Sequence, residues 1–239
     1  SFVREQNLWV HDLATGDERP ITTEGGGLVS FGMAEFVAQE EMKRDTGYWW
    51  SPDDTRIAVA RVDESPVEVV QRLGIDAEDV TVTEQRYHHA GTANAIVELW
   101  IHDVKTGERV QVDLGDDPDV YLVRVDWSED GSELWVQRQN RAQTRLDVLA
   151  ADPETGATRV ALTERAPTWI NLSDDLLPLE DGGFLWTSER SGHRHVYRHH
   201  PDGRTEALTR GAWVVDELSG VDEARGRVWF EGWTTTPLE

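Results

Sequence analysis

Residues 127–131 (Trp-Ser-Glu-Asp-Gly), followed by an apolar strand at 134–138 (Leu-Trp-Val-Gln-Arg), are the stretch that decides the fold. The same order of a Trp, a polar turn and an apolar strand occurs at 50–61, where Trp-Ser-Pro-Asp-Asp leads to Ile-Ala-Val-Ala-Arg. Weaker copies lie at 179–186 and 221–230. A unit that recurs in this way predicts an all-β fold built from repeated strand–turn–strand elements.

A second repeated element is a turn of the form Asp-x-x-Thr-Gly, found at 12–16, 103–107 and 152–156, with a weaker copy at 200–203. The Asp side chain accepts turn hydrogen bonds and Gly supplies a positive φ, so the motif predicts hairpins. Asp103 and Asp152 are 49 positions apart, a period typical of propeller blades. The 239 residues would hold about four to five such blades. A β-sandwich with similar turns is the alternative.

Composition excludes several classes of function. The chain has 23 Lys and Arg against 46 Asp and Glu, a formal net charge of −23. This charge argues against nucleic-acid binding and against docking on an anionic membrane, and would attract cationic ligands. There is no cysteine, which excludes disulfides, thiol nucleophiles and Cys-type zinc sites. No apolar stretch approaches the length of a membrane span.

Known catalytic and metal-binding motifs are also missing from the sequence. It contains no Gly-x-Ser-x-Gly elbow, no Walker loop and no His-Glu-x-x-His motif. His193 and His195 would share one face of a strand, but no third ligand is spaced to complete a metal site. We therefore expect neither a metal nor another cofactor.

Two segments interrupt the strand pattern. Residues 34–47 show no β alternation, and they predict a short inserted helix with Gly47 as its C-terminal stop. Residues 65–96 are long for a connection and polar in their second half, which predicts a functional or interface role. Within the helix, Glu40 and Glu41 are adjacent, and their long side chains can converge on one ammonium group. An ordinary acidic helix surface is the alternative.

The run at 34–42 (Ala-Glu-Phe-Val-Ala-Gln-Glu-Glu-Met), followed by 47–53 (Gly-Tyr-Trp-Trp-Ser-Pro-Asp), closely resembles the propeller of the bacterial dipeptidyl peptidase IV family. Further matches follow at 60–64, 85–94, 123–127, 137–139, 188–192 and 195–197. The resemblance covers the whole chain and implies that residues 1–239 are part of an N-terminal β-propeller domain. The catalytic α/β-hydrolase domain would then lie outside this chain, and both ends of the sequence look cut from a longer protein.

By this resemblance, Glu40 and Glu41 match the carboxylates that bind the free N-terminal amine of a peptide substrate. The parent protein would then be a serine exopeptidase that releases Xaa-Pro or Xaa-Ala dipeptides, while this chain alone would hold no catalytic residue. The family also has a propeller Arg that contacts the substrate carbonyl, which no residue here matches. Its usual compartment is periplasmic or secreted. Unpaired blade edges would favour either a homodimer through those edges or a distorted open arc. A non-catalytic propeller that serves as an interaction scaffold is the alternative function.

Overall fold

The computed structural model describes residues 1–234, and it confirms that each repeated Asp-x-x-Thr-Gly motif forms a hairpin turn. In the first copy, Asp12 Oδ1 accepts hydrogen bonds from the backbone N–H groups of Ala14 (2.8 Å) and Thr15 (3.0 Å). Gly16 closes the turn at φ 79°, in the left-handed region that favours glycine. The copies at Asp103 and Asp152 repeat this pattern.

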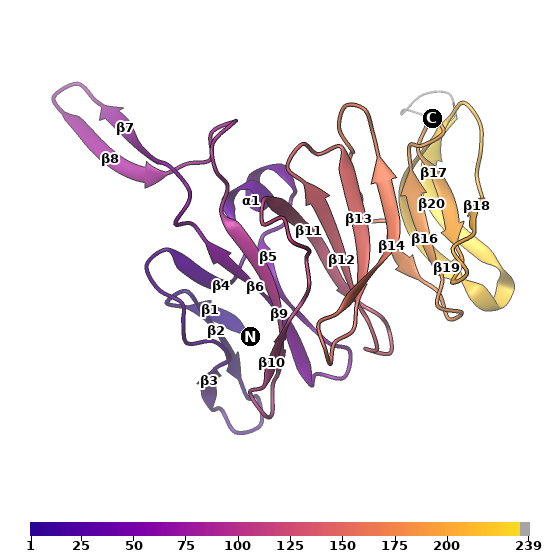
Figure 1. Ribbon diagram of the computed structural model, residues 1–239, viewed down its shortest axis with the longest axis horizontal. Helices are drawn as coiled ribbons and strands as arrows, with labels where there is room; N and C mark the ends of the chain where they lie inside the picture. The colour runs from indigo at the N-terminus through magenta and orange to yellow at the C-terminus, as the bar shows by residue number, and fades with distance from the viewer. Residues whose placement is uncertain (235–239) are drawn as a thin grey trace. The chain divides into compact units, whose positions relative to one another are not determined.

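The first strands form two antiparallel sheets. One has the order β1-β2-β3, and the other has the order β10-β9-β6-β4-β5 (Figure 1). Their bounds are β1 Phe2–Arg4, β2 Asn7–His11, β3 Glu18–Pro20, β4 Val29–Met33, β5 Thr46–Trp50, β6 Arg56–Asp63, β9 Ile96–Asp103 and β10 Arg109–Gln111. Tyr48 to Trp50 of β5 pair with Val59 to Ile57 of β6, so the turn at 50–54 forms a hairpin, as predicted.

The later strands form consecutive antiparallel sheets in chain order: β11-β12-β13-β14, then β15-β16-β17-β18, then β19-β20. The bounds are β11 Val120–Trp127, β12 Leu134–Asn140, β13 Arg145–Ala151, β14 Thr158–Arg165, β15 Leu177–Pro178, β16 Phe184–Ser188, β17 His195–His199, β18 Thr205–Ala207, β19 Val214–Asp222 and β20 Arg227–Trp233, with a 3-10 turn at Glu223–Arg225. Sheets made of successive strands are the blade pattern of propellers. The prediction of an all-β chain with about four to five blades is confirmed.

Both interrupting segments differ in detail from expectation. The helix α1 spans only Phe36–Glu41, and Gly47 is not its stop, because Gly47 lies in β5 opposite Gly32 of β4. Residues 65–96 are not mainly a loop: β7 (Val69–Ile75) and β8 (Val80–Arg86) form a two-stranded hairpin that projects from its neighbours (Figure 1). Neither the helix stop nor the hairpin follows from the local pattern alone.

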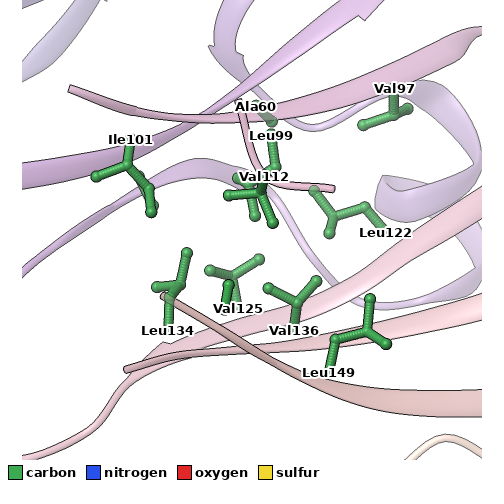
Figure 2. Packing of buried hydrophobic residues seen from close by; sticks show 12 residues of the cluster. Ala60, Val97, Leu99, Ile101, Val112, Leu122, Val125, Leu134, Val136 and Leu149 are labelled. Carbon is green, nitrogen blue, oxygen red and sulfur yellow. The ribbon is translucent and has the colours of Figure 1, made fainter. Parts of the chain in front are cut away.

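The chain divides into two compact units, the first formed by Ser1–Arg141 with Val148–Val160, the second by Ala142–Asp147 with the chain from Ala161 onward. In the first unit, side chains of the five-stranded sheet point toward side chains of β11 to β13 (Figure 2). The labelled residues that form this core are Ala60, Val97, Leu99, Ile101, Val112, Leu122, Val125, Leu134, Val136 and Leu149. The second unit has its own cluster around Leu185, Val196 and Val215.

Candidate functional site

Glu40 and Glu41 lie in the last turn of α1, the helix that connects β4 to β5. Both side chains are exposed, and neither forms a hydrogen bond or an ion pair with any of residues 1–234. No basic residue occupies the last turn of the helix. Two carboxylates at a helix C-terminus meet the negative end of the helix dipole, which is locally unfavourable. The pair is therefore an uncompensated negative site on a structured element.

The start of α1 is held by a buried carboxylate. Glu35 is 5% exposed, and its side chain accepts hydrogen bonds from the backbone N–H groups of Val37 and Ala38, the latter at 2.9 Å. Burial raises the pKa of Glu35, against the opposing effects of these hydrogen bonds and of the Arg44 charge. Capping of this kind satisfies N–H groups that have no partner inside the helix.

The end of α1 is held by a buried guanidinium. The backbone N–H groups of Met42 and Arg44 both donate to Ala38 O, at 3.2 and 3.0 Å, and Lys43 between them has φ 54°. The Arg44 side chain is 5% exposed and donates to Thr46 O at 2.7 Å. It also reaches Leu122 O of β11 at 3.0 Å. Burial lowers the pKa of Arg44 from 12.5 to about 10, so the group is still a cation at neutral pH.

The strand pairing is irregular next to Leu122, the residue whose carbonyl accepts this bond. The pairing of β11 with β12 shifts register between Leu122 and Arg124. A bulge interrupts the regular ladder of backbone hydrogen bonds at the extra residue. Arg44 therefore connects the turn after the Glu pair to a strand 78 positions further along the chain. The helix is short, but Glu35 caps its N-terminal end and Arg44 bonds the turn that follows it to β11.

Sequence reasoning predicted a site at the Glu pair but missed Glu35 and Arg44, the buried charges on either side of it. Glu35 precedes the helix directly, yet Glu is not among the residue types most preferred at that position. Arg44 looks like an exposed charge next to Lys43 and Asp45, and nothing local predicts its burial. The signal that could have found both is their opposite charge on either side of the helical segment.

The two histidines considered as metal ligands, His193 and His195, do not form a site in the described part of the chain. His195 is buried, and its ring nitrogens lie 3.0 Å from Thr209 Oγ1 and 3.0 Å from Gly211 O, which anchors the segment after β18. His193 lies outside β17. Within residues 1–234, no group of three or more His, Asp or Glu side chains is arranged to hold a metal ion. In the same part of the chain, no helix has the length and hydropathy needed to cross a membrane.

Comparison with known proteins gives the family. Residues 1–239 match the family model described as the dipeptidyl peptidase IV N-terminal region. A probable dipeptidyl-aminopeptidase B of Emericella nidulans is 30% identical, with 100% of this chain and 30% of the relative aligned. Dipeptidyl peptidase 8 of Mus musculus is 28% identical, with 100% of this chain and 36% of the relative aligned. The chain thus spans about a third of the length of these relatives.

A solved structure agrees with the sequence comparisons. The crystal structure of Porphyromonas gingivalis dipeptidyl peptidase 4 superposes with a TM-score of 0.86 at 27% identity. The match covers 97% of this chain and 33% of the other. The fold of this chain is therefore a known architecture. The chain belongs to the dipeptidyl peptidase IV family and corresponds to its N-terminal region.

Proposed function

We propose that this chain is the substrate-selecting propeller part of a serine exopeptidase that releases Xaa-Pro or Xaa-Ala dipeptides from the N-terminus of peptides. The observation that carries the proposal is the exposed, uncompensated pair Glu40 and Glu41 on a helix whose two ends are anchored by buried charges. A scaffold that only binds other proteins has no need for carboxylates in this unfavourable position.

The chemistry of the pair suits a peptide amine. An N-terminal ammonium carries three N–H donors, and two carboxylates can accept from it along different directions in charge-assisted hydrogen bonds. If the amine is held at a fixed distance from the nucleophile, only a fixed number of residues fits between the amine and the bond that is cleaved. Such positioning also lowers the barrier, because the reacting groups no longer have to be brought together.

Hydrolysis would be carried out by other residues of the parent protein. Residues 1–239 contain no Gly-x-Ser-x-Gly elbow, and a Ser–Asp–His triad in a C-terminal α/β-hydrolase domain would supply the nucleophile. The natural partners of this chain are then its own hydrolase domain and a peptide with a free N-terminus. We expect the isolated chain to bind such peptides without cleaving them.

The test uses the full-length protein and two substrates, a Gly-Pro chromogenic amide and its N-acetylated form. Glu40→Gln and Glu41→Gln should each raise the KM for the free-amine substrate by about 10- to 100-fold, the value of a hydrogen bond to a charged group. The acetylated substrate should be cleaved poorly by all variants. Glu129→Gln is a matched control, since Glu129 is also exposed but lies in a turn between β11 and β12.

Two results would overturn the proposal. If Glu40→Gln and Glu41→Gln behave as Glu129→Gln does, the pair is ordinary helix surface. If the full-length protein cleaves neither substrate, the non-catalytic scaffold is the better description of its function.

We also infer a homodimer, formed through the β7–β8 hairpin rather than through open blade edges. The pairs Leu73–Val82 and Ile75–Val80 place four exposed apolar side chains on one face of the outer half of the hairpin. A two-stranded hairpin is marginally stable by itself, and an apolar face without cover costs free energy. A second hairpin of the same kind is a self-complementary partner for this face.

Light scattering on the full-length protein tests the dimer. Val82→Glu should give a monomer, because it places a charge in the apolar face. Thr83→Glu, on the opposite polar face of the same strand, should stay dimeric. A dimer that persists in Val82→Glu, or a monomeric wild type at high concentration, would contradict the inference.

A further inference from the structure

The ring of Phe36 joins the helix of the Glu pair to the segment that follows the hairpin. Phe36 is the first residue of α1. Its ring lies 5.5 Å from the ring of His88, with the planes at 3° to each other. The ring of Tyr87 meets Phe36 edge-on, at 5.3 Å and 61°. These geometries are the ones that aromatic pairs prefer.

The segment that carries Tyr87 and His88 is attached to the sheet without help from the helix. The backbone N–H of Ala95, a buried residue, lies 3.4 Å from His88 Nε2. Arg141 donates to Thr92 O at 2.8 Å. Burial, and then the charge of Arg141, lower the pKa of His88, so an uncharged imidazole faces Phe36 at neutral pH. Phe36 therefore packs against an anchored surface.

The position of Phe36 in the helix links this contact to the Glu pair. Phe36 and Glu40 are four residues apart, so their side chains lie on the same side of the helix, one turn from each other. A helix of six residues has little stability of its own, and its rotation about its axis is set by its contacts. Glu35 caps the N-terminal end of the helix and Arg44 bonds the turn after it to β11, and Phe36 adds a side-chain contact that resists rotation.

We propose that Tyr87 and His88 are positioning residues for the amine site, and that they determine through Phe36 the direction in which Glu40 points. This inference rests on the proposed amine-binding role of the Glu pair and adds the residues that orient it. Among residues 1–234, neither Tyr87 nor His88 forms a hydrogen bond or an ion pair with either carboxylate, and both act by holding the ring of Phe36.

The experiment measures KM and kcat of the full-length protein for a Gly-Pro chromogenic amide. His88→Ala and Phe36→Leu should each raise KM by about three- to tenfold, the range expected for an aromatic pair, while kcat changes less than KM. His88→Phe should restore the KM, because a flat ring can again stack on Phe36. His11→Ala is the control: His11 is an exposed histidine at the end of β2, and its ring contacts none of Phe36, Tyr87 and His88.

The outcomes separate this inference from the proposed function. If Glu40→Gln raises KM while His88→Ala and Phe36→Leu leave it unchanged, the positioning role is wrong and the amine anchor stands. If Glu40→Gln has no effect, the anchor itself is wrong, and the positioning role falls with it. A general structural role would lower the melting temperature without a change in KM and without rescue by His88→Phe, and that result also overturns the inference.

Discussion

Replacing Gly47 by Ala tests the close backbone contact between β4 and β5, the two strands that α1 connects. Gly47 of β5 lies against Met33 of β4, and a Cβ at Gly47 would be 2.4 Å from Met33 O and 2.5 Å from Met33 C and N. Ordinary van der Waals contact for a Cβ begins at 3.4 Å, so β4 and β5 would have to separate by about 1 Å. The clash is with backbone atoms, and no side-chain rotation can relieve it.

Strain of this kind in a packed region costs about 1–3 kcal/mol. For a chain of this size, each kcal/mol lowers the Tm by about 2–4 °C, so Gly47→Ala should lower the Tm by about 2–12 °C. Thermal unfolding followed by circular dichroism measures the change. Gly220→Ala is the matched control, because Gly220 also lies in a strand, but a Cβ there would have no heavy atom within 4 Å. A Gly47→Ala protein as stable as Gly220→Ala would refute the reasoning.

Three further predictions concern stability. Burial lowers the pKa of His102 and of His199 from 6.5 to about 4. The unfolded chain therefore binds protons at these residues more readily than the folded chain, and the free energy of unfolding in urea should fall from pH 6.5 toward pH 4. Replacing both with Gln should flatten this profile, and a flat wild-type profile would contradict the assignment. Asp175 accepts hydrogen bonds from the backbone N–H of Leu218 and from the hydroxyls of Ser173 and Thr187. Asp175→Ala removes this acceptor and should lower the free energy of unfolding by about 1–3 kcal/mol in the same assay. Equal stability of Asp175→Ala and wild type would show that these bonds contribute nothing. Glu40→Gln and Glu41→Gln should each raise the free energy of unfolding by at most about 1 kcal/mol, because they remove negative charge from a helix C-terminus. A loss of stability would mean that the carboxylates have partners in the folded protein.

Much of the fold could be predicted from local sequence, because its signals act within a few residues. Asp12 and Gly16 belong to one turn, where a side-chain acceptor and a positive φ are needed within five positions. The strand 134–138 was recognisable from its apolar residues directly after such a turn, and it forms β12. The insertion at 34–47 was visible because its residues break the alternation of a strand.

The limits of the helix could not be predicted in the same way. Gly47 was expected to stop the helix, since Gly is common after helix ends. In the structure Lys43 adopts the left-handed conformation instead, and Gly47 is required where two strands approach closely. Glycine is suited both to the end of a helix and to a close approach of two strands. Only the pairing of β4 with β5 shows that Gly47 has the second role.

The sequence by itself determined that this protein is a repeated, all-β chain with two adjacent carboxylates on an inserted helix, because hairpin turns, strand alternation and residue identity are local properties. Only the tertiary structure decided which contacts hold that helix. Arg44 reaches Leu122 across 78 positions, and Phe36 stacks on His88 from a different segment of the first unit. Contacts of this range depend on which strands become neighbours, and no pattern within a few residues of either partner specifies them.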